Sequence, residues 1–275
     1  MNKREGKIWI DGMQNVLAGE TLAATDIRER LGDRHSVDVL PDVWVLKIGG
    51  QSIMDRGGEA VHPILEELRT AQKNGTKFVI GAGGGTRARH VYALGLDLEM
   101  PTGMLARLGS SVPVQNARML QMLMAKDGGI MMYPDDFEKL PFFLNAGCIP
   151  IMSGMPPNEF WEKSASVGLL PTNRTDAGVY LMAEFLGAKG VLFIKDEDGL
   201  YTDDPKKNPD AKLIPEANAA ELLASGQDDL IVERVVLEYM TRAEKVKEIR
   251  IINGLKPGQV TAALNGEQVG SVIRA

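Results

Sequence analysis

A lysine and three acids follow one apolar stretch of the chain, and residues of these types can hold a nucleotide together with Mg²⁺. Residues 191–194 read Val-Leu-Phe-Ile, which predicts a buried strand, and the run from Lys195 to Asp198 comes directly after it. Carboxylate oxygens are preferred ligands of Mg²⁺, and a lysine beside them can contact a phosphate. Taken alone, a charged surface turn is the simpler interpretation, so this segment needs support from elsewhere in the chain.

The residues that follow add features that a nucleotide loop needs. Gly199 permits backbone conformations that most residues resist, as a tight turn requires. Tyr201 offers a flat aromatic face to a base, and Asp204 precedes Pro205, which restricts the exit of the loop. We therefore expect residues 195–207 to form one side of a nucleotide site.

A first glycine-rich segment follows an apolar strand predicted over residues 43–48. Gly49 and Gly50 come at the end of this strand, where glycines let backbone N–H groups approach an anion closely. Lys47 precedes them and is the best candidate for a cation that contacts phosphate. The alternative is a strand-end lysine that simply extends its ammonium group to water.

A second glycine-rich segment repeats this design over residues 78–89, where a predicted strand, three glycines and a helix follow one another. Gly84 and Gly85 would donate backbone N–H groups, and Arg87 and Arg89 carry guanidinium groups that match phosphate oxygens. Neither segment has the spacing of a Walker loop or of a G-x-G-x-x-G fingerprint. Each is weak evidence alone, but three such loops at predicted strand ends together indicate one phosphate site.

Asp176 opens a predicted helix in the sequence Arg-Thr-Asp-Ala, and two roles are open for it. As a simple N-cap it would stabilise the helix by about 0.5–2 kcal/mol. As a functional acid it would organise a lysine or a metal ion near the γ-phosphate, and both roles can hold together. The histidines His35, His62 and His90 include no pair at metal-ligand spacing, so the sequence predicts no zinc or iron site.

Composition sets the broad class of protein. The chain has 275 residues and 44% hydrophobic content, enough for one large α/β domain or two lobes. A net charge of −6 argues against a general surface for nucleic acid or anionic membrane. The single Cys148 cannot form an internal disulfide, and no signal peptide or stretch of about 18 apolar residues is present, so we expect a cytoplasmic protein.

The order of predicted elements indicates how the loops are positioned. From residue 42 onward, strands alternate with amphipathic helices, including helices expected over residues 58–74 and 114–126. This alternation predicts an α/β fold, a three-layer sandwich with a mostly parallel central sheet, over residues 41–275. Residues 1–40 are expected to form an N-terminal arm with a short helix over 21–31. Ligands of such sheets bind at the carboxyl ends of the strands, where the loops fall.

These segments resemble the amino-acid kinase superfamily, and within it the uridylate-kinase-like branch. The matching pieces are residues 47–50, 83–89, 174–177, 198–205 and 253–258. The resemblance implies an amino-acid kinase-like fold that binds ATP with Mg²⁺. It implies catalytic roles for Lys47 and Asp176. The residues expected to bind the nucleotide are Gly49, Gly50, Gln51, Gly84, Gly85, Arg89, Lys195, Asp198, Gly199, Tyr201 and Asp204.

A longer set of segments resembles the beta-type chains of the molybdenum-storage family. They include residues 48–52, 84–90, 109–116, 153–157, 174–178 and 195–202. This resemblance implies a heterohexameric cage with alpha-type subunits, in which ATP hydrolysis is coupled to storing molybdate or tungstate as polyoxometalate clusters. The alpha-type histidines that contact clusters have no counterpart at Met132 to Pro134, so this chain is not expected to hold every cluster by itself, and whether it requires an alpha partner or forms homo-oligomers stays open.

A small-molecule kinase that phosphorylates UMP or a similar metabolite is the alternative, because alignment and charge stabilisation suffice for phosphoryl transfer. The segment over residues 153–174 carries two consecutive prolines, Phe160 and Trp161, and reads as an interface or cavity-wall loop rather than an acceptor pocket. The sequence therefore favours storage over the kinase, while leaving open whether this subunit hydrolyses its ATP.

Overall fold

The computed structural model describes residues 3–4, 7–10, 13–14, 37–155, 170–227 and 230–275. Residues 38–275 form one compact unit. The short strands β1 (Lys3–Arg4), β2 (Lys7–Ile10) and β3 (Met13–Gln14) form a separate antiparallel sheet near the N-terminus. The helix expected over residues 21–31 and residues 156–169 of the expected wall loop lie outside the described residues.

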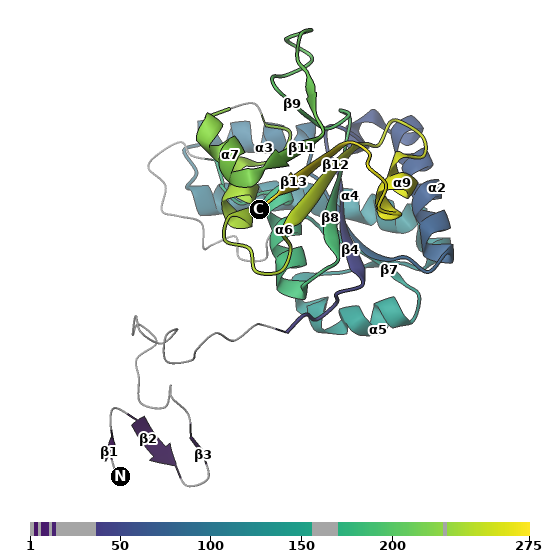
Figure 1. Cartoon of the computed structure of the whole chain (residues 1–275). Coiled ribbons are helices and arrows are strands. Elements are labelled where there is room, and N and C mark those ends of the chain that lie inside the picture. Colours follow the sequence, from purple (N-terminus) through teal and green to yellow (C-terminus); the bar gives the residue numbers. More distant parts are fainter. Residues whose placement is uncertain (1–2, 5–6, 11–12, 15–36, 156–169, 228–229) are drawn as a thin grey trace. The chain divides into compact units, whose positions relative to one another are not determined.

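One sheet organises the described part of the compact unit, with the strand order β11-β13-β12-β8-β4-β5-β7-β6 (Figure 1). The strands from β12 to β6 run parallel to one another, whereas β13 is antiparallel to β12 and pairs in parallel with β11. The mostly parallel sheet expected from the sequence is therefore confirmed. The strand bounds are β4 Val43–Ile48, β5 Lys77–Ala82, β6 Gly129–Met131, β7 Ile149–Ser153, β8 Gly190–Lys195, β11 Glu216–Asn218, β12 Glu248–Asn253 and β13 Ser271–Arg274.

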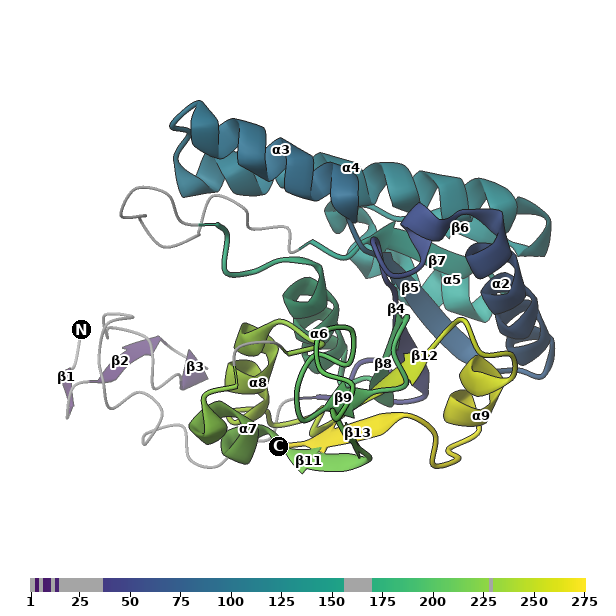
Figure 2. The same ribbon diagram turned by 90° about the horizontal axis from the view of Figure 1, so that it is seen from above.

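Helices cover both faces of this sheet and complete the three-layer sandwich. Alternate residues of β4 point to opposite faces, so Val45 packs in one apolar core and Leu46 in the other. Figure 2 shows α6, α7 and α8 on one side of the central strands and α2 and α9 on the other. The helix bounds are α2 Gly58–Lys73, α3 Thr86–Asp97, α4 Thr102–Leu123, α5 Leu140–Asn145, α6 Thr175–Leu186, α7 Ala219–Ser225, α8 Arg234–Met240 and α9 Gln259–Leu264.

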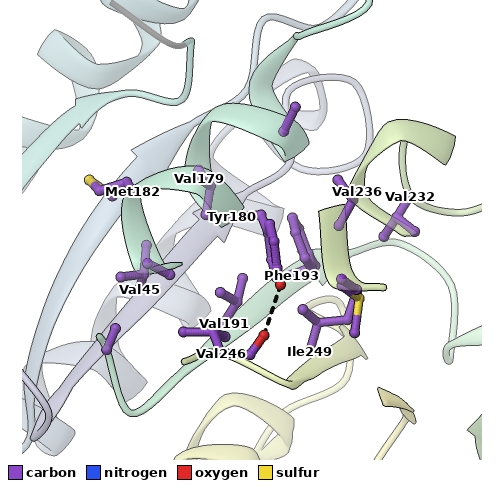
Figure 3. Packing of buried hydrophobic residues seen from close by; sticks show 14 of the residues in the cluster. Val45, Val179, Tyr180, Met182, Val191, Phe193, Val232, Val236, Val246 and Ile249 are labelled. Atoms are coloured by element: carbon purple, nitrogen blue, oxygen red, sulfur yellow. Dashed lines mark hydrogen bonds between the residues drawn. The ribbon is translucent and has the colours of Figure 1, made fainter. Parts of the chain in front are cut away.

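Helix α6 is held firmly over the sheet, which matters because it carries Asp176. Its residues Val179 and Tyr180 pack against Val191 and Phe193 of the central strand β8 (Figure 3). The Tyr180 hydroxyl donates a hydrogen bond to the Val246 carbonyl at 2.8 Å, and burial raises the pKa of this phenol. The first turn of α6 is therefore fixed relative to the strand ends.

The expected element pattern was wrong in several places. The helix expected over residues 114–126 begins much earlier, because α4 runs from Thr102 to Leu123 with Pro113 inside it. Leu105, Ala106 and Gly109 are buried in this additional part of the helix, so tertiary packing outweighs the poor helix propensity of glycine and proline there. The helices α5 and α9 and the strand β11 were not expected at all.

Candidate functional site

The carboxyl ends of two neighbouring strands bring two lysines together. Strand β4 pairs with β8 in parallel register, with Lys47 opposite Phe193 and Ile48 opposite Ile194. Lys47 and Lys195 therefore emerge at the same edge of the sheet. Lys47 is only 5% exposed, and a buried ammonium group needs an anionic partner in the protein or in a ligand.

Asp176 is that partner and binds both lysines. The Lys47 ammonium donates to Oδ1 of Asp176, and the Lys195 ammonium lies 3.0 Å from Oδ2. Burial alone would raise the pKa of Asp176, but Lys195 and Lys47 hold that pKa well below its ordinary value. Burial also lowers the pKa of Lys195, and the like charge of Lys47 acts in the same direction. The carboxylate is thus ionised, while the two ammonium groups compete for it.

Glu233 is a further acid at this site that sequence reasoning missed. Its carboxylate accepts hydrogen bonds from the N–H groups of Asp176 at 3.2 Å and Ala177 at 3.0 Å, at the start of α6. Glu233 therefore caps the helix, and Asp176, the second helical residue, is free to bind the lysines. Burial and the neighbouring Asp176 raise the pKa of Glu233.

Arg174 adds a third cation beside these acids. Its Nε lies 3.7 Å from Glu233 Oε1, and this buried atom has no hydrogen-bond partner in the part of the chain described. A buried donor without an acceptor is costly, and an anionic ligand would relieve this cost. The cluster of Lys47, Lys195, Arg174, Asp176 and Glu233, here called the lysine cluster, is formally cationic.

The two glycine-rich loops lie directly against each other beside this cluster. The Gly83 N–H donates to the Ile48 carbonyl at 2.9 Å, which joins the ends of β5 and β4. A Cβ atom added at Gly50 would collide with Gly85 N and lie 2.7 Å from Gly84 C. Glycine is required at Gly50 because backbone, which cannot move aside, occupies the space of a side chain.

Gly50→Ala is therefore expected to destabilise the fold by about 1–3 kcal/mol through overpacking. It should also separate the two loops and weaken nucleotide binding. Thermal unfolding and calorimetry with ATP would measure both effects. Gly58→Ala is the matched control, since its new methyl group would meet only the His62 ring, at 3.0 Å. Equal stabilities of the two variants would contradict the close approach of the loops.

Not every expected glycine amide is available to a ligand. The Gly49 N–H donates to the Ile194 carbonyl at 3.0 Å and so extends the sheet. Within the described residues, by contrast, no hydrogen bond uses the N–H of Gly50, Gly84 or Gly85. Three of the four amides expected to meet phosphate thus remain open.

A protein carboxylate already lies at the start of α3. Asp55 Oδ2 accepts a hydrogen bond from the Thr86 N–H at 2.6 Å, at the positive end of the helix. The Asp55 N–H in turn donates to the Gly50 carbonyl at 2.9 Å, which ties the carboxylate to the first loop. Asp55 therefore occupies part of the position that an incoming anion would take.

The arginines of α3 differ in their contacts. Arg87 is exposed and donates to the side chains of Gln115 and Asn116, so it ties α3 to α4. Arg89 is exposed, as is Gln51, and neither side chain has a hydrogen-bond or ion-pair partner among the residues that the structure describes. Both side chains are available to a ligand.

The acidic loop after β8 contributes unevenly to the site. Asp198 is bound by Asn253 at 2.9 Å and by Lys256 at 2.7 Å, and the hydrogen bond from Lys256 lowers the pKa of Asp198. Asp204 accepts the Lys206 N–H at 2.9 Å within its own turn. Tyr201 belongs to the short strand β9 (Leu200–Tyr201), which pairs with β10 (Leu213–Ile214).

Of the expected residues in this loop, only Lys195 is brought into direct contact with Lys47 or Asp176 in the described structure. Gly199 approaches the sheet so closely that an added Cβ would overlap the Ser271 side chain. Ser271 Oγ accepts the Leu200 N–H at 2.7 Å there, which fixes the start of β9.

The residues present fit a bound triphosphate. The cluster supplies cations, the loops supply open N–H groups, and Arg174 supplies an unpartnered donor. No group of three or more His, Cys, Asp and Glu residues in the described ranges is arranged to hold a metal ion. Mg²⁺ usually binds through substrate phosphates, waters and one or two carboxylates.

A mostly parallel sheet with glycine loops and buried lysines at its carboxyl edge is the architecture of an α/β protein of the kinase type, and the chain belongs to the amino acid kinase family. The family model matches residues 42–253. Among curated proteins, the chain is 47% identical over 263 residues to the molybdenum storage protein subunit beta of Azotobacter vinelandii, covering 96% of this chain and 97% of that protein.

Uridylate kinases are more distant relatives. The enzyme of Metallosphaera sedula is 26% identical over 235 residues, covering 83% of this chain and 97% of that protein. The solved structure of UMP kinase from Bacillus anthracis aligns with this chain at a TM-score of 0.65 and 20% sequence identity. The alignment covers 86% of this chain and 96% of the UMP kinase chain. This structural match shows the shared fold, and both resemblances stated from the sequence are confirmed.

Proposed function

We propose that this chain is a beta-type subunit of a molybdenum and tungsten storage complex that binds ATP with Mg²⁺. In this role it helps to deposit molybdate as polyoxometalate clusters in a cage formed with alpha-type subunits. The observation that carries the proposal is the convergence of two glycine loops beside the lysine cluster. The 47% identity to a molybdenum storage subunit supports storage as the use of that site.

ATP would be held through its phosphates at the edge of the sheet. Lys47 and Lys195 would contact the phosphate oxygens, and the open N–H groups of Gly50, Gly84 and Gly85 would bind them as backbone donors. Mg²⁺ would neutralise part of the phosphate charge when bound. Gly49 would shape the loop. Gln51, Arg89, Asp198, Gly199, Tyr201 and Asp204 stay predictions for contacts around the nucleotide.

A pocket beside α4 supports the proposal that this chain helps to bind the oxide cargo. It has a volume of about 390 Å³ and lies between α4 and the ends of β6 and β7. Serine hydroxyl groups and Arg107 line it, and such groups can bind oxide oxygens. The segment from Met132 to Pro134, which lacks the alpha-type histidines, forms part of this wall. This chain would therefore supply only part of a cluster site.

Exposed apolar side chains support assembly into a larger complex. Leu94 and Leu98 at the end of α3, and Met104 and Met122 on α4, are each at least 46% exposed. Exposed apolar surface of this kind is often buried between subunits. A heterohexamer with alpha-type subunits would bury part of it.

The second candidate function, a UMP-type kinase, is favoured by the uridylate kinase relatives. Their sequence identities of 26% and 28% are far below the 47% shared with the storage subunit, which makes this function the weaker candidate.

Elemental analysis of the purified complex decides between the two functions. The storage proposal predicts that incubation with molybdate and ATP–Mg²⁺ yields many molybdenum atoms per chain. It also predicts that omission of ATP reduces loading to near one atom or less. An assay of UMP phosphorylation on the same preparation is the second arm. Little metal together with rapid UMP phosphorylation would establish the kinase and reject storage.

A further inference from the structure

A pocket at the opposite edge of the sheet is separate from the lysine cluster. It has a volume of about 360 Å³ and is lined by Trp44, Gly190 and Glu248, which lie at or near the first residues of β4, β8 and β12. Because these strands are parallel, their amino ends lie at the edge away from Lys47 and Lys195. The proposed nucleotide site does not use this edge.

The lining of this pocket is strongly cationic. Its charged residues are one acid, Glu248, and the cations Lys189, Lys245, Lys247, Arg250 and Arg274. Glu248 is already shared, since its carboxylate binds Arg250 at 3.0 Å and Arg274 at 3.3 Å. A chain with a net charge of −6 thus gathers an excess of positive charge at one place.

Two of these cations lack counter-ions in the described part of the protein. Lys189 and Lys247 have no ion-pair partner among the residues that the structure describes, and both are exposed. The Lys189 ammonium lies 5.5 Å from the centre of the Trp44 ring, and the Arg250 guanidinium lies 6.0 Å from the same centre. Like charges held around one ring repel each other, and a bound anion would remove this repulsion.

Trp44 provides a second, independent observation. Its indole N–H is buried and lacks a hydrogen-bond partner within the described ranges, which costs about 1–3 kcal/mol. The ring packs on Gly190, where an added Cβ would lie 2.7 Å from a ring carbon.

We propose that this pocket binds a polyvalent inorganic oxyanion of the phosphate and molybdate type. Lysine ammonium groups are compact charges that suit a small, highly charged anion, and the pocket has room for such an anion with its hydration water. The Arg250 and Arg274 guanidinium groups add positive charge on the same pocket wall. This site stands independently of the proposed storage function.

The test uses the assembled protein with ¹⁵N-labelled tryptophan and no nucleotide. Phosphate and molybdate are titrated separately at constant ionic strength while the indole N–H signals are followed. Trp44→Phe identifies the Trp44 signal, and Trp9 and Trp161 serve as internal references. We expect the Trp44 signal to move in a saturable manner. The anion with the lower Kd, phosphate or molybdate, is identified as the ligand of this pocket.

The variant Lys189→Gln/Lys247→Gln should raise the Kd at this site at least tenfold, because it removes both cations without counter-ions. Lys126→Gln, a change at an exposed lysine outside the pocket, should leave the Kd unchanged. Lys47→Ala should also leave it unchanged, which separates this site from the nucleotide site. A Trp44 signal that does not respond to either anion, or equal affinity in the double variant, would overturn the proposal.

Discussion

Lys47→Ala is expected to weaken ATP binding by about 10- to 150-fold. The Lys47 ammonium is buried at the strand end, and a charge-assisted hydrogen bond of this kind contributes about 1.5–3 kcal/mol. The fold should persist, because Lys195 still neutralises Asp176 in the variant. Calorimetric titration with ATP–Mg²⁺ measures the affinity, and circular dichroism checks the fold.

Lys77→Ala is the matched control for this experiment. Lys77 also belongs to a strand of the sheet and also pairs with an aspartate, Asp42, at 2.9 Å, but this pair is exposed. Its removal should leave ATP affinity unchanged. The assignment of Lys47 to the nucleotide site would have to be abandoned if both variants bound ATP as tightly as the unaltered protein.

Asp176→Asn should produce the largest loss of stability of any single change at the site. Asp176 is 3% exposed and binds Lys47 and Lys195, so the variant leaves both ammonium groups without the carboxylate that they bind directly. Breaking a buried ion pair in this way costs about 3–5 kcal/mol. For a domain of this size, a lowering of Tm by about 10 °C is expected.

ATP should narrow the difference in Tm between Asp176→Asn and the unaltered protein, because its phosphates can replace the missing negative charge beside the lysines. Asp42→Asn is the control, since it breaks an exposed pair worth about 1 kcal/mol or less. Thermal scans with and without ATP–Mg²⁺ measure both effects. A constant difference in Tm would mean that the lysines do not face the nucleotide.

Much of the fold could be predicted from the sequence because apolar strands and amphipathic helices alternate clearly from residue 43 onward. Strand β8 was expected over residues 191–194 and is observed over Gly190–Lys195. Helix α4 was predicted only in its second half. Gly109 and Pro113 suggest a break in that segment, and only packing against the sheet and α3 keeps the helix continuous.

The site was only partly predictable for a related reason. Lys47, Asp176 and the two glycine loops each have a local signal, namely a strand end, a helix start or a run of glycines. Glu233 has none, because its role depends on α8 packing beside the first turn of α6. The hydrogen bond from the Gly49 N–H to the Ile194 carbonyl likewise depends on the pairing of β4 and β8, two strands distant in sequence.

The placement of Asp55 has a consequence for how the chain would respond to a ligand. Any phosphate that binds the amide at the start of α3 must exchange places with this carboxylate, so measured affinity reports a competition between two anions. Asp55 belongs to the short 3₁₀ turn Met54–Arg56, whose N–H groups bind the carbonyl oxygens of Gly49 and Gly50. Displacement of Asp55 would loosen that turn, which lies just before α2. A phosphate bound at the glycine loop would then also affect the position of α2.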